Sequence, residues 1–520
     1  MGQRRRERAE DRISNLPDHL LQSILHLLPL KSAVRTDLLS KRWRGLWLNV
    51  LLSATDLDFG PDFAAAESPD QFSATVDRYL RLHGNSPLRR LRILFSPFDH
   101  LLPAIDTWVA VAATKRVEEF DLDLSQGIID GVEGDYMDGR GQYLLPAALF
   151  RCESLTHLSL SRCDFSRPAH FAVFRRLNEL NLCRVNVTDE ALQELLVDCP
   201  VLERLSLMNC RLLGAVRVVG EPELQLRALA LVDCPGIDEL EINAPKLQSF
   251  VYSGGVCSQI DFGGMPELVD AKLSLVAGDS MEADYGDAIA QLSQVRNLSL
   301  CSGTLACIVA NEEFEAEDFE VMFPNLHELQ VTMKHISKEY LACVYDFFRH
   351  YPSPFLEKLF IQLPKDVHDL PEYFKLIISD IQKPPDIALD NLKVIKMTNF
   401  QGSNNEMKLV KFLLERAAAL EYLLLVSPPF DGTDCLAKQN VEIEQTNPEE
   451  RMWIKIILGQ ISALPKASPE VCIKLVEFWQ DEDTINPTHN NNLYSRYDYQ
   501  SGTVCHKLVH ALFRGDIGVD

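Results

Sequence analysis

The sequence predicts an α/β fold, in which a short helical segment precedes a long solenoid of parallel strands joined by helices or turns. Two observations lead to this prediction. A leucine motif with the spacing L-x-x-L-x-L-x-x-C recurs through the middle of the chain, and apolar residues near the N-terminus recur at helical spacing. With 520 residues, 46% of them hydrophobic, the chain can bury a substantial core.

Three short helices are predicted in the N-terminal segment. In the first, residues 16–28, apolar side chains recur every three or four positions, and Pro17 stands in the first turn, where its missing N–H is harmless. Pro29 ends this helix, Ser32 is the expected N-cap of the second, and a third run carries two tryptophans. About 40 residues are too few to bury this apolar surface internally, so a partner or the adjoining body should cover part of it.

The same segment closely resembles the plant F-box. The matching strings are ISNLPDHLLQSIL (Ile13 to Leu25), LPLKSAVRT (Leu28 to Thr36) and LSKRWRGLW (Leu39 to Trp47). In that family these strings dock on a Skp-like adaptor, which links to a cullin scaffold. The resemblance implies these adaptor-binding residues: Leu16, Pro17, Leu20, Leu21, Ile24, Leu28, Pro29, Val34, Leu39, Ser40 and Trp43.

One position departs from the family pattern. Relatives usually carry an uncharged small residue where this chain has Asp37, and we expect that side chain to lie on the exposed side of the second helix. A helical cap on the repeat region, without a partner, would explain the periodicity equally well. It would not predict the Leu-Pro entry or the Leu-Ser-Lys-Arg-Trp string.

The repeat motif has the spacing of a leucine-rich repeat (LRR). Its four clearest copies begin at Leu155, Leu177, Leu202 and Leu226, which are 22, 25 and 24 residues apart, inside the range that one strand and its return require. The alternating leucines point to one face of each strand, so stacked repeats form a parallel sheet whose other positions face the concave side.

Cysteines occupy the last motif position in three copies, as Cys163, Cys210 and Cys234. A small polar group there satisfies turn backbone, so we expect a structural role rather than a metal ligand or nucleophile. Weaker copies of the motif extend the array on both sides, beginning at Leu88, Val117, Ile237, Leu247, Val295, Leu326 and Leu356. The Asp- and Gly-rich stretch from Gly127 to Gly141 is expected to be an exposed insertion.

Residues 392–425 predict a strand, a turn, a helix and a strand. This block resembles the FBD domain found behind plant F-box/repeat bodies, and it is also one further repeat that we expect to cap the sheet edge. A helix over Trp453 to Leu464 and a strand over Val471 to Phe478 are expected next. We divide the chain into a basic tail (1–10), an F-box (11–52), an LRR region (53–384), the FBD segment (385–427) and a C-terminal extension (428–520).

The charge balance argues against nucleic acid as a partner. The net charge is −24, although residues 1–50 hold ten Lys or Arg against five Asp or Glu, so the remaining body is strongly acidic and repels phosphate. The cluster from Arg4 to Arg8 fits either a nuclear address or a solvated tail. The expected location is the nucleus, the cytoplasm or both.

No membrane segment, disulfide or catalytic motif is expected. Apolar runs are too short to span a bilayer, and the first ten residues are charged where a signal peptide has an apolar core. The thirteen cysteines include no CxxC pair, which favours reduced thiols. No nucleotide-binding glycine loop, hydrolase elbow or zinc spacing occurs, so no cofactor and no metal are predicted.

The resemblance implies a non-catalytic substrate receptor of an SCF-type ubiquitin ligase. The F-box would bind the adaptor while the LRR body holds an unknown protein target, so that tethering raises the effective concentration of the target lysine beside a conjugating enzyme. Two alternatives stay open. One is an interaction scaffold that promotes no ubiquitin transfer, and the other is a receptor for a small ligand held in the repeat cavity.

Overall fold

The structure is a computed structural model. It describes residues 13, 16–28, 30–60, 63, 68–95, 99–125, 142–165, 173–219, 224–276, 285–309, 323–333, 336–364, 384–428, 448–481 and 485–487. These residues form two compact units, the first ending at Leu202 and the second beginning at Glu203. The basic tail and the whole stretch from Gly127 to Gly141 lie outside the described residues. Within the described residues, no helix is both long and apolar enough to cross a membrane.

The first unit begins with four short helical elements: α1 (Asp18–His26), α2 (Leu30–Arg35), the 3-10 helix η1 (Thr36–Leu38) and α3 (Leu46–Ser53). The second helix begins two residues before Ser32, so the expected cap is wrong; Leu30 and Lys31 favour helix and form its first turn. Gly45 precedes α3 at a φ of +75°, a left-handed conformation that suits glycine. The third predicted helix therefore starts only at Leu46, and Trp43 lies in the turn before it.

A parallel sheet follows in the first unit, with strand order β1, β2, β3, β5, β7. Core residues align across it in register as Leu57, Leu91, Phe120, Leu158 and Leu180, each at most 1% exposed. The bounds are β1 (Asp56–Phe59), β2 (Arg90–Leu94), β3 (Glu119–Asp123), β5 (His157–Ser161) and β7 (Glu179–Cys183). Two short strands, β4 (Tyr143–Leu144) and β6 (Cys163–Asp164), pair separately.

Helices connect these strands. The first, α5 (Pro69–His83), starts with a capping box in which Ser68 and Gln71 exchange side-chain and backbone hydrogen bonds. The others are η2 (Asp99–Leu101), α6 (Leu102–Thr114), η4 (Leu149–Arg151) and α7 (Asp189–Asp198). The repeat array therefore begins directly after the F-box helices, one strand before the first predicted copy at Leu88.

In the described residues of the second unit, ten parallel strands form the main sheet, in the order β8, β10, β12 and β14 through β20. Their core residues also stack in register, as in the column Leu205, Leu229, Phe250. The bounds are β8 (Arg204–Met208), β10 (Ala228–Val232), β12 (Ser249–Gly255), β14 (Asp270–Val276), β15 (Asn297–Cys301), β16 (Glu328–Thr332), β17 (Lys358–Gln362), β18 (Val394–Thr398), β19 (Tyr422–Val426) and β20 (Cys472–Val476).

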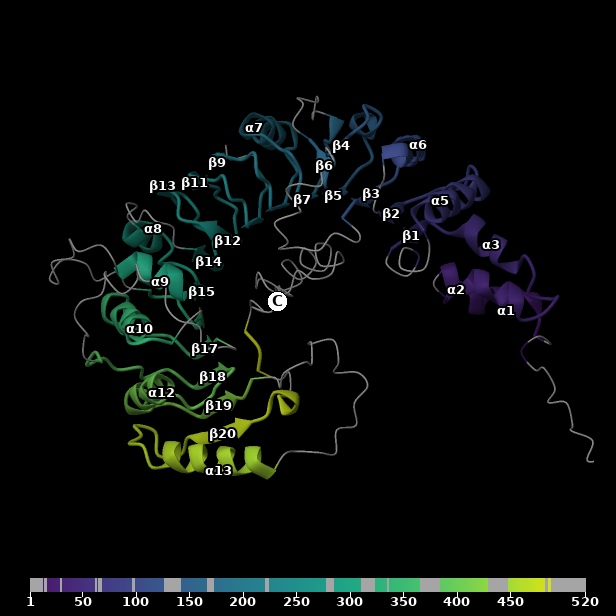
Figure 1. Cartoon of the computed structure of the whole chain (residues 1–520). Coiled ribbons are helices and arrows are strands. Elements are labelled where there is room, and N and C mark those ends of the chain that lie inside the picture. Colours follow the sequence, from purple (N-terminus) through teal and green to yellow (C-terminus); the bar gives the residue numbers. More distant parts are fainter. Residues whose placement is uncertain are drawn as a thin grey trace, which may run out of the picture. The chain divides into compact units, whose positions relative to one another are not determined.

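Helices cover one face of this sheet and leave the other as the concave side (Figure 1). Their bounds are α8 (Tyr285–Gln291), α9 (Ser302–Val309), α10 (Lys338–His350), α12 (Asn404–Arg416) and α13 (Pro448–Ser462), with the short η7 (Phe478–Gln480) after β20. The predicted α/β class, with F-box helices followed by a parallel-strand repeat body, is confirmed.

One predicted repeat is not a repeat of the main sheet. The copy at Ile237 forms β11 (Glu239–Asn243), which pairs with β9 (Ala215–Val219) and β13 (Gln259–Asp261) in a separate three-stranded sheet. The flanking repeat strands β10 and β12 pair directly with each other, so β11 belongs to the return of one repeat. Alternating apolar residues cannot distinguish a strand on the return from one on the concave face.

The FBD segment forms the predicted strand, helix and strand, namely β18, α12 and β19. It does not cap the sheet edge, because β20 pairs along β19 from Tyr422↔Cys472 to Val426↔Val476. The outermost strand of this part of the chain therefore belongs to the C-terminal extension. The helix and the strand expected in that extension are both present, as α13 and β20.

Candidate functional site

The entry to α1 is held by a residue from the third F-box string. Arg42 donates a hydrogen bond to the backbone oxygen of Leu16, and its Nη2 lies 3.0 Å from the Asp18 carboxylate. Pro17 occupies the N-cap position, and Asp18 adds negative charge to the first turn, where the helix dipole favours it. The Leu-Pro entry and the Leu-Ser-Lys-Arg-Trp string therefore form one structure, in which Arg42 contacts Leu16, 26 residues away.

Asp37 joins η1 to α3. Its Oδ1 accepts a hydrogen bond of 2.8 Å from the Gly45 backbone N–H, and its Oδ2 accepts one of 3.1 Å from Trp47 Nε1. The side chain is half-buried, so the expectation that it would lie on an exposed helix side is wrong. A carboxylate satisfies both donors at once, since it offers two acceptor oxygens and no proton.

Apolar residues divide the F-box helices into an inner and an outer set. The inner set is buried within the unit: Leu21, Leu25, Ala33, Trp43, Trp47, Val50 and Leu51. The outer set lies between residues 20 and 39 and is exposed: Leu20 (41%), Ile24 (36%), Leu27 (85%), Leu28 (36%), Leu38 (89%) and Leu39 (66%). Leu52 on α3, 47% exposed, lies outside this stretch. We call these six residues the F-box apolar set. Four of them lie at i, i+4, i+7 and i+8 along and just after α1, which places them on one side of that helix.

The predicted adaptor-binding residues therefore occupy different environments. Leu20, Ile24, Leu28 and Leu39 are exposed, as is Pro17, whereas Leu16, Val34 and Ser40 are half-buried. Leu21 and Trp43 are at most 3% exposed and pack inside the unit. Pro29 lies outside the described residues.

The structure adds two exposed leucines that the resemblance did not supply. Leu27 and Leu38 have the largest exposed fractions of the F-box apolar set. The signal was present in the helical spacing, because Leu27 follows Leu20 by seven residues. Leu38 lies in η1, whose 3-10 geometry shifts its side chain relative to a continuous α-helix.

The F-box helices pack directly on the first repeat. The Tyr79 ring of α5 lies 5.8 Å from Trp47 and 6.0 Å from each of Phe59 and Phe63, measured between centroids. Lys31 of α2 donates to the Phe63 backbone oxygen at 3.3 Å, with its Nζ 5.2 Å from that ring centroid. This junction, in which aromatic rings bury apolar area on both sides, joins the two segments without a flexible linker.

Acidic side chains occupy the concave positions of β3. Asp121 Oδ2 lies 3.1 Å from Arg92 Nε, and Asp123 Oδ1 accepts hydrogen bonds from the N–H and hydroxyl of Ser125. Burial raises the pKa of Asp123 to about 6, with the Ser125 hydroxyl hydrogen bond opposing the shift and the Asp121 charge adding to it.

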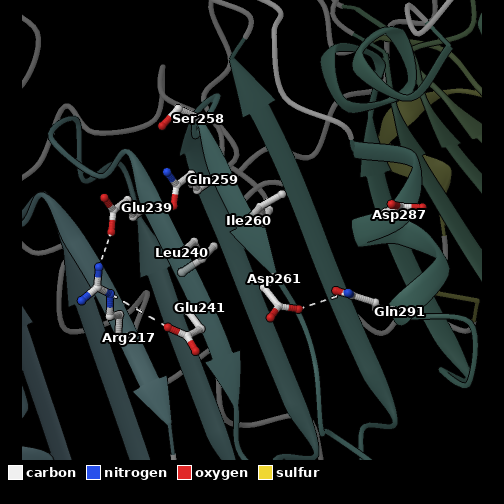
Figure 2. A pocket seen from close by; sticks show the side chains of 10 residues that line it. All are labelled: Arg217, Glu239, Leu240, Glu241, Ser258, Gln259, Ile260, Asp261, Asp287 and Gln291. Atoms are coloured by element: carbon white, nitrogen blue, oxygen red, sulfur yellow. Dashed lines mark hydrogen bonds and ion pairs between the residues drawn. The ribbon is translucent and has the colours of Figure 1, made fainter. Parts of the chain in front are cut away.

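The second unit carries a hollow of about 680 Å³ on its three-stranded sheet (Figure 2). Glu239, Glu241 and Asp261 line the hollow, and all three carboxylates already form ion pairs or hydrogen bonds within the chain. Arg217 lies 2.6 Å from Glu239 and 3.9 Å from Glu241, and Asp261 accepts a 3.1 Å hydrogen bond from Gln291. The hollow is open and polar, unlike the mostly apolar pockets that hold small molecules.

The motif cysteines have the predicted structural role. Cys163, Cys210 and Cys234 are buried, and each thiol lies within 3.6 Å of the carbonyl oxygen two residues earlier. Burial raises the pKa of the Cys163 thiol far above its ordinary value, which disfavours the nucleophilic thiolate. Among the described residues, no group of three His, Cys, Asp or Glu is placed to hold a metal ion.

One cysteine contradicts the expectation of reduced thiols. Ten described cysteines are free, but Cys183 is in a disulfide. The expectation of no bridges is therefore wrong for this residue.

Two family models match the chain. A model described as the At1g61320/AtMIF1 LRR domain matches residues 80–452, and an F-box domain model matches residues 13–53. The F-box match covers every element from α1 to α3, and the LRR match extends through the FBD segment into α13.

Curated relatives from Arabidopsis thaliana are similar over most of the chain. F-box/LRR-repeat protein 13 is 26% identical over 446 residues, covering 80% of this chain and 89% of that protein. The putative F-box/LRR-repeat protein At5g54820 is 27% identical over 503 residues, covering 90% and 99%. The putative FBD-associated F-box protein At5g56440 is 33% identical over 309 residues, covering 56% and 64%.

Proposed function

This chain belongs to the plant F-box/LRR-repeat family, and from that premise we propose that it is the substrate-receptor subunit of an SCF-type ubiquitin ligase. The F-box binds a Skp-like adaptor and, through it, a cullin scaffold, while the LRR body binds a protein target. The chain itself supplies no acid, base or nucleophile to ubiquitin transfer. It acts by holding the target close to the conjugating enzyme.

The F-box apolar set is the observation that carries this proposal. Six large apolar side chains are exposed between residues 20 and 39, and two tryptophans are buried directly after them. Exposed apolar groups gathered at one place mark interaction surfaces more often than chance exposure does. An amphipathic helix that presents such a stripe fits helix-in-groove recognition by an apolar partner surface.

The free energy gained by burying these side chains is comparable to the free energy cost of association. Burying about five of these side chains at roughly 1.5 to 3 kcal/mol each releases on the order of 7 to 15 kcal/mol. Association costs about 4 to 15 kcal/mol in lost freedom. Because the two amounts are comparable, binding needs most of the set, and the loss of two central residues should abolish it.

The inner residues have a different role in the proposal. Leu21 and Trp43 are buried, so they position the surface that docks rather than touch the adaptor. Leu20, Ile24, Leu28 and Leu39, together with Leu27 and Leu38, make the contact. Asp37 and Arg42 act through the backbone turns that they hold.

Co-elution of the full chain with a recombinant Skp-like adaptor in size-exclusion chromatography tests the proposal. The double variant Leu20→Asp with Ile24→Asp should lose co-elution while its thermal unfolding stays cooperative. The matched control is Leu82→Asp with Leu144→Asp, which alters two leucines of similar exposure, 38% and 44%, outside the F-box. The control should co-elute normally. Equal behaviour of the two double variants would overturn the assignment of this surface.

The two alternative functions make different predictions in cells. Proximity labelling with the proteasome blocked should recover ubiquitin-modified neighbours that depend on residues 1–50. Neighbours whose lifetimes do not change when residues 1–50 are removed would instead support an interaction scaffold. Thermal stabilisation of the purified chain by a small molecule would support a ligand receptor.

A further inference from the structure

A row of in-register residues crosses the concave face of the second unit. Ser299 on β15 aligns with Gln330 on β16, which aligns with Phe360 on β17 and then with Lys396 on β18. Each alternates along its strand with core-facing residues, so its side chain points to the concave side. We call these four residues, with Gln362 one concave position further along β17, the concave row.

One end of the concave row is occupied by the chain's own C-terminal extension. After β20 the chain passes through η7 and turns back towards the earlier strands (Figure 1). There Lys396 Nζ donates to Asp481 Oδ1 at 2.9 Å, to the Ile485 backbone oxygen at 2.9 Å and to Asn486 Oδ1 at 3.4 Å. We call residues 477–481 and 485–487 the returning segment.

This contact uses the full hydrogen-bonding capacity of the lysine. An ammonium group has three donors, and the returning segment supplies a carboxylate, a carbonyl and an amide oxygen to them. The second Asp481 oxygen lies 2.8 Å from Nζ, and the two side chains are 3% and 15% exposed. Solvent and salt screen such a pair far less than a surface pair.

Acceptors elsewhere in the concave row have no donor among the described residues. Gln330 Oε1, Ser299 Oγ and Gln362 Oε1 are buried without a hydrogen-bond partner. The Gln330 amide donates to Glu328 Oε1 at 2.7 Å, which fixes the side chain with its oxygen unpaired. Unpaired buried acceptors are rare in native proteins, because each forfeits the hydrogen bonds that it made to water. They call for N–H donors.

An extended peptide supplies both an acceptor for the Lys396 ammonium and N–H donors for the unpaired oxygens. A carboxylate on the peptide can take the place of the Asp481 carboxylate at Lys396, while its backbone N–H groups reach Gln330 and Gln362. Neighbouring strands are about 4.8 Å apart, so Lys396 and Gln330 are roughly 10 Å apart, the length of about three extended residues. An acidic segment of the chain itself already sits at one end, which shows the chemistry that this face accepts.

We propose that the concave row binds an acidic, extended segment of the protein target, and that the returning segment occupies its Lys396 end as an intramolecular competitor. This inference deepens the proposed function, because it names the class of target segment. A target gains access by displacing the returning segment. Such a competitor sets a minimum affinity that a target segment needs in order to bind, because the tethered segment acts at an effective concentration on the order of millimolar.

The test uses a fluorescent peptide with the sequence of residues 477–487, EFWQDEDTINP, and fluorescence anisotropy on the full chain. Asp481→Asn weakens the internal contact and should tighten peptide binding at least tenfold relative to the unchanged chain. Adding Lys396→Met to Asp481→Asn should remove that gain. The matched control adds Lys411→Met instead, a lysine on the outer helix α12, and should leave the gain intact.

Several outcomes overturn the inference: no gain in Asp481→Asn, no loss on adding Lys396→Met, or an equal loss on adding Lys411→Met. A second measurement covers a variant that fails to fold. Saturating peptide should speed amide exchange of residues 485–486 in the unchanged chain, and unaltered exchange there also refutes displacement. Adaptor co-elution is measured on the same proteins. Intact co-elution without peptide binding refutes only this inference, and peptide binding without co-elution refutes only the adaptor role.

Discussion

Asp123 is a carboxylate in surroundings that disfavour its charge. Burial raises its pKa to about 6 against an ordinary value of 3.8. The folded protein therefore binds more protons than the unfolded chain between about pH 4 and 6, and stability falls as pH rises through that window. Above pH 6 the full cost of the buried charge is present.

Asp123→Asn should therefore stabilise the protein at pH 7 by about 1 to 3 kcal/mol, because it removes the charge and keeps an acceptor for Ser125. At pH 4 the gain should nearly vanish. Urea unfolding at both pH values measures this difference. The control is Asp58→Asn, which alters an exposed carboxylate on β1 of the same sheet. A gain for Asp123→Asn that does not depend on pH would contradict the raised pKa of Asp123.

At this scale the sequence predicts residue classes better than residue environments. The spacing of Leu20, Leu21 and Ile24 indicated a helix, and the resemblance treated all three as contacts, yet Leu21 is buried and the other two are exposed. Adjacent residues on a helix face differ by only 100° in direction, so periodicity alone could not separate them.

The repeat turns contain a backbone conformation that sequence rules would not place. Arg162, Arg184, Asn209 and Asp233 have φ between 51° and 58°, each directly after a repeat strand. Arginine rarely adopts this left-handed conformation. The stacked turns impose it, so the repeat rather than the residue type determines the backbone there.

Among the elements, the F-box turn before α3 depends on one side chain. Asp37 accepts hydrogen bonds from the Gly45 N–H and the Trp47 indole N–H. Among the described residues, no other acceptor is bonded to either donor. Removal of Asp37 leaves the half-buried Gly45 N–H and the buried Trp47 indole N–H without their acceptor. The cost of an unpaired buried polar group is about 1 to 3 kcal/mol.

Asp37→Ala should therefore lower the free energy of unfolding of the first unit by roughly 1 to 3 kcal/mol. Asp18→Ala is the matched control, because its ion pair with Arg42 is exposed and should contribute less than about 1 kcal/mol. Urea unfolding followed by tryptophan fluorescence measures both. Equal effects of the two substitutions would contradict the role given to Asp37.

The positions of the strands were easier to predict from the sequence than which strands pair with each other. The leucine motif located β5, β7, β8 and β10, because alternation and a constant period together specify stacked parallel strands. It could not show that β11 belongs to a second sheet, or that β20 continues the main sheet beyond the FBD segment. Those outcomes depend on how the returns between strands pack, which the motif does not encode.

In the molecule as a whole, the exposed and the buried residues of the F-box helices have different tasks. The F-box apolar set is exposed, while the inner F-box residues pack through Trp47 and Tyr79 onto the first repeat. An adaptor bound to the F-box apolar set would therefore be attached to the first repeat through packed side chains.

The concave row was not predictable from the sequence. Gln330, Gln362 and Lys396 lie on three strands whose register no local pattern gives, and Asp481 is 85 residues from its lysine. The motif specified which positions face the concave side. Only the folded sheet brought these four residues to one surface.

Hydrogen exchange of the full chain, with and without a Skp-like adaptor, distinguishes docking through the F-box apolar set from docking through the repeat body. Docking through the F-box apolar set predicts slower amide exchange over residues 18–28 and 36–39 in the complex, with unchanged exchange in strands β14 to β18. Protection of the concave strands with no change in α1 and η1 would contradict it.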